Sequence, residues 1–379
     1  MGEITSTSAT EPGWPSVSVV MPARDEEAHL RHAVERVLAD TYDGELEMVV
    51  VVGPSRDRTQ ALAEELAREY PQVRVIKNPS GRTPQAMNLG IAATTHPIVV
   101  RVDAHGFLPD GYVARSVELL RETGAANVGG QMVPKGVTPL GRAIARAMSS
   151  RLGIGSAPFH VGGEAGPTES VYLGVFRREA LEEVGGFDEH FIRAQDWELN
   201  YRIRAAGHTV WFSPDLRVIY RPRSRYRALA KQFFGSGRWR REIIAHYPSS
   251  VSARYLAPPL AVIAVVLGTT AALVGVAFGL EWLRWAAVFP IGYLLFTVLA
   301  SIAQIPHLAL NALVRFPGVL IVMQMLWGAG FLLGPSRARF TRRRARAEAL
   351  AQAQRPHAVP DEAAPQQKSP VPTPEARAD

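Results

Sequence analysis

Short apolar runs alternate with amphipathic stretches along the first third of the chain. The runs are rich in β-branched residues and stop at turn-forming residues such as Pro22 and Gly53, which is typical of buried strands. Between them, apolar residues recur three or four positions apart, as on one face of a helix. This alternation predicts an α/β fold around a mostly parallel sheet. The predicted strands are Val17–Met21, Met48–Val52, Val73–Lys77 and Ile98–Val102.

The helices between these strands are predicted from the same spacing and from capping signals. Residues 30–38 and 59–70 carry the helical pattern. Thr83 is a favourable N-cap residue, and Pro84 suits the first helical position that follows it. A third helix is therefore predicted to begin at Pro84.

Three long apolar runs without a charged residue occupy the C-terminal part of the chain. Each approaches the length of about 20 residues that crosses a bilayer. Buried helices of a soluble protein are the alternative, but the clustering of the runs, with Trp282 and Trp285 where an interface would lie, favours a membrane region. The runs are Leu256–Leu280, Ala286–Ile305 and Phe316–Gly334.

The net charge of +7 is concentrated beside these runs. Residues 215–255 hold ten Lys and Arg against two acidic residues, a balance that suits phosphate groups, nucleic acid or anionic lipid. Because an apolar span follows directly, we expect lipid and not nucleic acid. Arginines also follow the third run, and basic flanks on both sides predict an even number of crossings. One run would then re-enter or lie in the interface, with Pro306–Pro317 as the expected irregularity.

Composition and charge predict how the whole chain is divided into segments. The absence of cysteine excludes disulfides and thiolate metal sites. The N-terminus is polar and does not resemble a signal peptide, while the C-terminal tail is rich in Pro, Ala and charge, which is typical of disorder. We expect a disordered segment, an α/β domain, a basic juxtamembrane segment, a membrane region, and a tail that is basic and then disordered. These segments are residues 1–16, 17–214, 215–255, 256–334 and 335–379.

Three aspartates follow predicted strands. Asp25 comes after the first strand, Asp57 after the second, and Asp103 at the end of the fourth. Ligands gather beyond the carboxyl ends of parallel strands. One such aspartate would be an ordinary solvated turn residue, but three at equivalent places favour a shared site.

The sharpest local pattern is Arg101-Val102-Asp103-Ala104-His105. Residues two apart in an extended chain face the same side, so Asp103 and His105 can reach one ion. Oxygen and imidazole ligands suit Mn²⁺ well and Mg²⁺ less well. The cation would neutralise a diphosphate and make it a better leaving group. Taken alone, a histidine after a strand is more often a turn or surface residue.

A series of short motifs runs along residues 17–240. They are Val19–Glu27 (VVMPARDEE), Asp57, Gly81–Gly90 (GRTPQAMNLG), Asp103-Ala104-His105, Gly174–Leu181 (GVFRREAL), Gly185–Asp188 (GGFD), Gln195–Asn200 (QDWELN) and Gln232…Arg238-Trp239. Each is weak by itself. Their joint order resembles glycosyltransferase family 2, and within it the succinoglycan-type glucosyltransferases of exopolysaccharide assembly.

The resemblance implies a GT-A fold, which has a Rossmann-like, mostly parallel mixed sheet, here followed by transmembrane helices. It implies an inverting transfer of a hexose such as glucose from a UDP-sugar to a lipid-linked saccharide acceptor, by a membrane enzyme whose catalytic domain faces the cytoplasm. It assigns Asp25, Asp57 and Arg82 to the donor nucleotide, and Asp103 to the metal and diphosphate. His105 replaces the second aspartate of the common Asp-x-Asp form, so the choice between Mn²⁺ and Mg²⁺ stays open.

The resemblance also places the catalytic base at Asp196. An inverting displacement needs one base for the acceptor hydroxyl, and a carboxylate suffices. Asp196 precedes a helical pattern and is equally suited to cap that helix, and the two roles are compatible. Trp197 would line the acceptor sugar or pack in the core, which is the commoner outcome for a lone tryptophan.

A Gln232…Arg238-Trp239 element lies in the basic stretch, with a glycine-rich turn expected between Gln232 and Arg238. Arginine beside such a turn can clamp a diphosphate, or it can lie at the membrane surface. The neighbouring arginines are expected to meet anionic headgroups or a lipid pyrophosphate. They are Arg221, Arg223, Arg225 and Arg227.

Other functions fit parts of this pattern. The enzyme could instead transfer one sugar to a polyprenyl phosphate, making a lipid-linked donor. A processive synthase usually has membrane helices on both sides of its catalytic domain, and residues 1–16 offer none. A non-catalytic membrane scaffold would not need the complete set of carboxylates at Asp25, Asp57, Asp103 and Asp196.

Overall fold

The structure is a computed structural model that describes residues 13–334. Most of the predicted disordered N-terminal segment, and all of the tail predicted over 335–379, lie outside the described residues.

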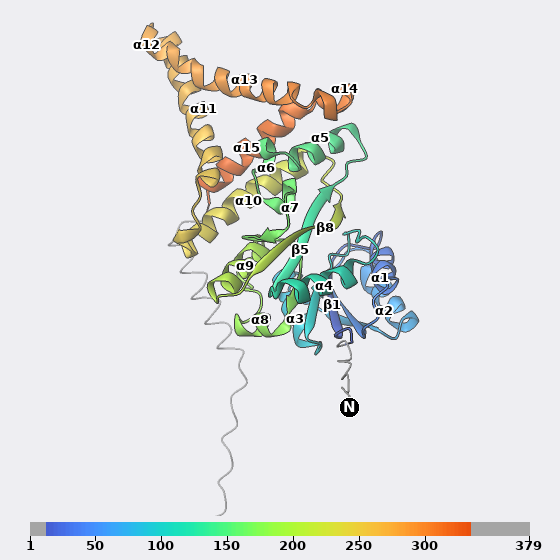
Figure 1. The fold of residues 1–379 in the computed structure, drawn as a ribbon. Coiled ribbons are helices and arrows are strands. Elements are labelled where there is room, and N and C mark those ends of the chain that lie inside the picture. The colour runs from blue at the N-terminus through green and yellow to red at the C-terminus, as the bar shows by residue number, and fades with distance from the viewer. Residues whose placement is uncertain (1–12, 335–379) are drawn as a thin grey trace, which may run out of the picture. The chain divides into compact units, whose positions relative to one another are not determined.

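Eight strands form one mixed sheet in the order β3-β2-β1-β4-β7-β5-β8-β6 (Figure 1). The first four strands along the chain pair in parallel, while β7 runs antiparallel to both β4 and β5. The predicted mostly parallel α/β sheet is therefore confirmed, with an antiparallel strand in its middle. The strands are β1 (Val17–Ala23), β2 (Leu46–Val52), β3 (Val73–Lys77), β4 (Ile98–Arg101), β5 (Asn127–Pro134), β6 (Gly166–Pro167), β7 (Tyr172–Arg177) and β8 (Val210–Tyr220).

Helices cover both faces of the sheet. Successive residues of a strand point to opposite faces, so Val19 packs in one core and Val20 in the other. The first core includes residues of α1 (Leu30–Leu38), α2 (Thr59–Glu69) and α4 (Tyr112–Thr123). The second includes residues of α3 (Thr83–Ala92), α8 (Arg178–Glu183) and α9 (Gln195–Ala205). Between these layers, the carboxyl ends of β1, β2 and β4 share one edge.

The predicted start of the third helix is shifted by one residue. Arg82 is the N-cap of α3, so Thr83 is the first helical residue and Pro84 the second. The side chain of this N-cap residue, Arg82, makes no capping hydrogen bond. Pro84 is still tolerated because the first-turn N–H groups have no partner within a helix.

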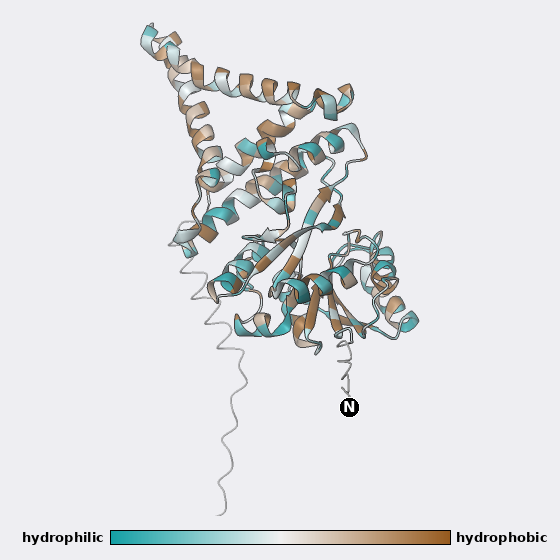
Figure 2. Ribbon diagram, in the orientation of Figure 1, coloured by the Kyte–Doolittle hydropathy of each residue, from teal (hydrophilic) through white to brown (hydrophobic). Residues whose placement is uncertain are grey.

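Three helical segments of the C-terminal part are long and apolar enough to cross a membrane. They are Ala253–Ala277, Glu281–Ile302 and Leu310–Leu332, close to the predicted runs. Figure 2 shows many apolar residues, in brown, along these helices. Trp282 and Trp285 are exposed at the start of the second segment. A short 3₁₀ turn (η3, Ile305–His307) precedes the third and overlaps the start of Pro306–Pro317, where an irregularity was expected.

The glycine-rich stretch before Arg238 is helical, which corrects the prediction of a turn. It lies inside α10 (Tyr226–His246), which packs along α15 (Phe316–Leu332). A Cβ on Gly237 would come within 1.9 Å of the Trp327 carbonyl oxygen, and one on Gly330 within 2.1 Å of the Phe234 carbonyl oxygen. The glycines therefore serve close approach of two helix backbones, a use of small residues that is common at membrane helix interfaces.

Replacing Gly237 by alanine is expected to destabilise the protein by about 1–3 kcal/mol, because the added methyl overpacks the α10–α15 contact. Thermal unfolding of the detergent-solubilised full chain measures the effect. Gly292→Ala is the matched control, since a Cβ at this helical glycine meets nothing within 4 Å. Equal melting temperatures for the two variants would contradict the packing role.

The remaining helices connect these layers. Residues of α5 and α10 join α15 in a third hydrophobic core, which links the sheet domain to the C-terminal helices. The helices not yet named are α5 (Pro139–Met148), α6 (Arg151–Ile154), α7 (Pro158–Val161), η1 (Pro248–Ser250), α11 (Ala253–Ala277), α12 (Glu281–Arg284), η2 (Trp285–Ala287), α13 (Val288–Ile302) and α14 (Leu310–Leu313).

Candidate functional site

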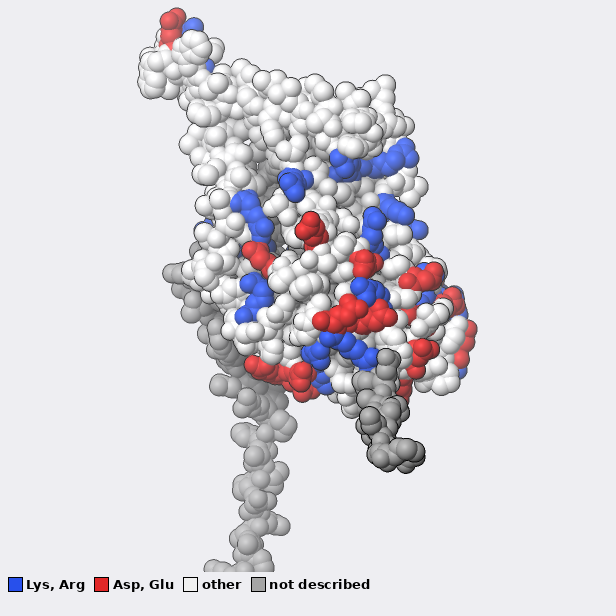
Figure 3. Space-filling model, in the orientation of Figure 1, with Lys and Arg blue, Asp and Glu red and all other residues white. Residues whose placement is uncertain are grey.

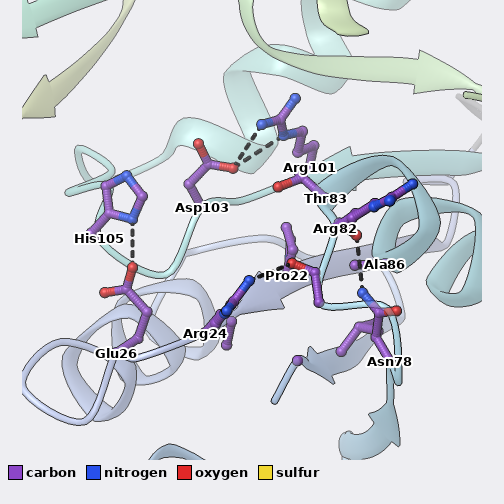
Figure 4. Close-up of a pocket in the computed structure, with 14 residues that line it drawn as sticks. Pro22, Arg24, Glu26, Asn78, Arg82, Thr83, Ala86, Arg101, Asp103 and His105 are labelled. Atoms are coloured by element: carbon purple, nitrogen blue, oxygen red, sulfur yellow. Dashed lines mark hydrogen bonds and ion pairs between the residues drawn. The ribbon is translucent and has the colours of Figure 1, made fainter. Parts of the chain in front are cut away.

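A pocket opens where the carboxyl ends of β1, β2 and β4 meet (Figure 4). The loops after these strands and the start of α3 supply its walls. More than half of the lining residues are charged or polar, which suits a nucleotide diphosphate more than an apolar ligand. The lining residues are Pro22, Ala23, Arg24, Glu26, Val51, Gly53, Asn78, Gly81, Arg82, Thr83, Ala86, Arg101, Asp103 and His105.

One buried arginine joins two of the predicted site carboxylates. Arg101 ends β4, and its Nε and Nη2 donate to Asp103 Oδ1 at 3.1 and 3.0 Å. Its Nη1 donates to Asp196 Oδ1. Burial disfavours the charge on the guanidinium, but the two carboxylates outweigh this and raise the pKa of Arg101. Asp103 and Asp196 therefore share one site, although they are far apart in the sequence.

Asp196 lies in the first turn of α9 and does not cap it. The N-cap is Ala194, which adopts a left-handed backbone conformation with φ of 58°. This turn frees the Asp196 carboxylate to face Arg101. About a third of the side chain is exposed (34%), yet the surrounding protein is dense enough that burial raises the pKa of Asp196, while Arg101 opposes the rise.

His105 lies in the same pocket as Asp103 and is held by a carboxylate. Its Nδ1 lies 2.8 Å from Glu26 Oε1. This hydrogen bond raises the pKa of His105, and the nearby Asp103 charge adds to the rise. A carboxylate on Nδ1 orients a histidine so that Nε2 can bind a metal, which is common around metal-binding histidines.

The donor set of Asp103 and His105 fits a divalent cation. An oxygen and an imidazole nitrogen suit Mn²⁺, and Glu26 supplies the supporting carboxylate. Within residues 13–334, no group of three or more His, Asp or Glu side chains is placed to hold an ion. The protein would thus contribute few ligands, and a diphosphate and water would supply the rest.

Replacing Glu26 by glutamine is expected to weaken Mn²⁺ binding by about 10- to 100-fold, as is typical for a residue that orients a metal ligand. The pH dependence should change too. Because Glu26 raises the pKa of His105, the imidazole takes up a proton, and repels the metal, at a higher pH than an ordinary histidine. The variant should therefore retain its remaining Mn²⁺ affinity to lower pH.

Calorimetric titration of the full chain with MnCl₂ in the presence of UDP, from about pH 6 to 8, tests this. Glu64→Gln on the surface of α2 is the control, and should bind like the wild type. Identical affinities and pH profiles for Glu26→Gln and the wild type would exclude the supporting role.

Asp25 and Asp57 lie together beside the pocket but do not line it. Asp25 Oδ1 accepts a hydrogen bond of 2.7 Å from the Arg56 backbone N–H. Asp57 Oδ2 accepts one of 3.1 Å from the Glu27 backbone N–H, and its other oxygen caps the start of α2 at Thr59. The Thr59 hydroxyl is the main reason that the pKa of Asp57 is lowered. The two aspartates thus tie the loops after β1 and β2 to each other.

The predicted acceptor residues do not line the pocket. Trp197 packs between Tyr201, with stacked rings 5.5 Å apart, and the Arg240 guanidinium, 4.7 Å from its ring. Trp239 packs against Phe191. Trp197 therefore contributes to packing between α9 and α10, and Trp239 to packing of α10 against the segment before α9.

Gln232 and Arg238 also lie on α10 and not in the pocket. The Oε1 of Gln232 is enclosed and has no hydrogen-bond partner within the described part of the chain. Arg238 is exposed. Among the predicted donor residues, Arg82 does line the pocket, together with Asp103 and His105.

Comparison with known proteins shows the family of this chain. The sequence model of glycosyl transferase family 2 matches residues 18–185. Over 337 residues the chain is 31% identical to the succinoglycan biosynthesis protein ExoA of Rhizobium meliloti, covering 87% of this chain and 95% of that protein. The chain belongs to glycosyl transferase family 2. This family 2 protein is thus a glycosyltransferase, which favours the enzymatic prediction over the non-catalytic scaffold.

Two further comparisons agree with this membership. The glycosyltransferase is 23% identical over 230 residues to the dolichyl N-acetyl-alpha-D-glucosaminyl phosphate 3-beta-D-2,3-diacetamido-2,3-dideoxy-beta-D-glucuronosyltransferase of Methanococcus voltae, covering 58% of this chain and 71% of that enzyme. Its fold resembles that of the mannosyltransferase PcManGT of Pyrobaculum calidifontis, solved with GDP-Man and Mn²⁺. The TM-score is 0.51 at 18% identity, covering 84% of this chain and 86% of that one.

Two polar residues of the site were not assigned a role from the sequence. Arg101 stands in the sharpest motif, and a charged residue at the end of an apolar strand was a signal for it. Glu26 stands in VVMPARDEE, where nothing local distinguishes it from Glu27. Both are recognised only by their partners in the folded chain.

Proposed function

We propose that this glycosyltransferase moves a hexose such as glucose from a UDP-sugar to a lipid-linked saccharide at the membrane, with inversion and with a divalent cation. The observation that carries the proposal is the Arg101 bridge. It holds a pocket carboxylate, Asp103, and a carboxylate suited to act as a base, Asp196, at one place.

In this mechanism the donor diphosphate lies in the pocket beside Asp103 and His105, which would hold the cation. When bound there, such a cation would neutralise the diphosphate and make it a better leaving group. Asp196 accepts the proton of the acceptor hydroxyl as that oxygen attacks the sugar. Arg101 keeps the Asp196 carboxylate oriented and ionised. Asp25 and Asp57 hold the loops against which the nucleoside rests.

The membrane-side features support a lipid-linked acceptor. Figure 3 shows Lys and Arg side chains below the largely uncharged surface of the C-terminal helices. Arg221, Arg223, Arg225 and Arg227 lie just before and at the start of α10, and can meet headgroups or a lipid pyrophosphate. Basic residues beside apolar spans also favour a cytoplasmic catalytic domain, at the inner or plasma membrane.

The names of the relatives support the same acceptor class. The Methanococcus voltae relative is named for a dolichyl phosphate that already carries a sugar. The Rhizobium meliloti relative is named for the synthesis of a polysaccharide. The metal is supported by the Asp103–His105 donor set and by the Mn²⁺ with which the related mannosyltransferase was solved.

A donor screen tests the proposal. Membranes containing the full chain are supplied with UDP-, GDP- and dTDP-sugars and Mn²⁺ or Mg²⁺, with and without a lipid extract, and release of the nucleoside diphosphate is measured. We expect release from a UDP-hexose only with lipid and cation. Equal release without either would contradict the lipid acceptor or the metal requirement. Transfer of radiolabelled sugar to a bare polyprenyl phosphate would instead favour synthesis of a lipid-linked donor.

A further inference from the structure

Tyr172 lies where the sheet meets the reaction centre. It is the first residue of β7, which pairs antiparallel with β4 so that Val100 lies opposite Val175. Because the pair is antiparallel, Tyr172 at the start of β7 lies at the carboxyl end of β4, which Asp103 follows. On its other side Tyr172 pairs with Gly130 of β5, next to a register shift in that ladder. The tyrosine therefore sits between two central strands at the edge that carries the site.

The hydroxyl of Tyr172 has no role in the fold. Its oxygen is enclosed, and no group within residues 13–334 hydrogen-bonds it. The ring packs against two hydrophobic cores, and a phenylalanine would make the same apolar contacts. A buried polar group without a partner costs free energy, and native proteins keep few of them without reason.

The groups around this hydroxyl are those of the proposed reaction. Burial, followed by the charge of Asp103, keeps the pKa of Tyr172 well above its ordinary value. The Arg101 charge opposes this rise in the pKa of Tyr172, and Tyr220 and Asp196 add to it. The phenol therefore stays protonated and can donate a hydrogen bond. Asp103, the carboxylate proposed for the cation and diphosphate, affects this pKa more strongly than Asp196 does.

The backbone next to Tyr172 is strained. Leu173 has a φ of 48°, in the left-handed region that a bulky side chain rarely adopts. The Tyr112 hydroxyl donates a hydrogen bond of 2.9 Å to the Leu173 carbonyl oxygen, which holds this backbone conformation in place. Strain of this kind persists where the surrounding structure enforces it, and it clusters at functional sites. Here, together with the register shift in the β5–β7 ladder, it sets the direction of the Tyr172 side chain.

We propose that the Tyr172 hydroxyl donates a hydrogen bond to a hydroxyl group of the transferred sugar, and that it thereby helps to select the donor. Tyr172 is not among the residues that line the pocket proposed for the nucleotide. Its proximity to Asp103 favours the sugar next to the diphosphate over the acceptor. This assignment rests on the proposed function and adds a contact to it.

Tyr172→Phe tests the assignment, because it removes only the hydroxyl. We expect the full chain in membranes to keep or raise its melting temperature and to keep its affinity for UDP. The kcat/KM for UDP-glucose should fall by about 10- to 100-fold, as when one transition-state hydrogen bond is lost. Tyr70→Phe, at the far end of α2, is the control and should have wild-type kinetics.

Deoxy donors supply the second measurement. The wild type should reject one of the 2-, 3-, 4- and 6-deoxy analogues of UDP-glucose far more strongly than the others, since a hydroxyl that the site binds is then missing. In Tyr172→Phe that analogue should be used as well as UDP-glucose. Wild-type kinetics in the variant, or an unchanged pattern of rejection, would overturn the assignment.

The same measurements distinguish failure of the proposed function from failure of the Tyr172 assignment. If the wild type uses a GDP- or dTDP-sugar and not UDP-glucose, the UDP assignment is wrong, and the same variants are compared on that donor and its deoxy analogues. If no sugar nucleotide is used, both proposals fall.

Discussion

Asp196→Asn is expected to abolish sugar transfer while nucleotide binding survives. Asparagine keeps the size of the side chain and can still face Arg101, but it cannot take a proton from the acceptor hydroxyl. Loss of a general base lowers the rate by about 10²–10⁴-fold. Asp196 does not line the donor pocket, so the affinity for UDP should change little.

Release of nucleoside diphosphate in the presence of lipid extract, and calorimetry with UDP and Mn²⁺, measure the two effects separately. Asp215→Asn is the matched control, because Asp215 is an exposed aspartate on β8 that pairs with Arg115. It should transfer sugar like the wild type. Substantial turnover by Asp196→Asn would remove this residue from the role of base.

Asp103→Asn is expected to impair binding of the cation and the nucleotide, which precedes sugar transfer. Asparagine is a weaker ligand than a carboxylate and does not neutralise the cation, so both Mn²⁺ and nucleotide binding should weaken, and transfer should fall by about 10²–10³-fold. This pattern differs from that of Asp196→Asn, in which binding persists. Arg101 would still pair with Asp196, so the fold around the base should survive.

Calorimetry with UDP, at increasing Mn²⁺ concentrations, measures the loss, and thermal unfolding checks the fold. Asp110→Asn is the control, since the Asp110 side chain is 91% exposed and pairs with Arg36 outside the pocket. Full Mn²⁺-dependent UDP binding by Asp103→Asn would place the cation elsewhere.

The two variants test two parts of the site. The sequence predicted the shared position of Asp103 and His105, but it did not predict the contact of Asp196 with Arg101. Asp103 and His105 are two residues apart, and their presence in one pocket follows from strand geometry. The position of Asp25 and Asp57 at the same sheet edge follows from the strand–helix alternation. The contact of Asp196 with Arg101 spans 95 residues, and no local pattern indicates which arginine it meets.

The glycines of α10 are a second case in which a distant contact, which the local sequence does not reveal, decides the structure. Glycine, serine and glycine in succession are typical of a turn, since glycine is a poor helix former. In the folded chain the backbone of α15 passes so close to Gly237 that only glycine fits. A partner helix far along the chain therefore decides the structure of this segment, and the local preference is overridden.

By itself the sequence determined what depends on near neighbours and on order along the chain. This includes the alternation of strands and helices, the three apolar spans, and the family to which the motifs belong. Only the tertiary structure decided which charged groups pair: Arg101 with Asp103 and Asp196, and Glu26 with His105. The physical reason is that hydrophobic periodicity acts over a few residues, whereas these pairs form only when the sheet brings distant loops to one edge. Tyr172 is the extreme case, since its hydroxyl is recognised by the absence of any partner within the described residues.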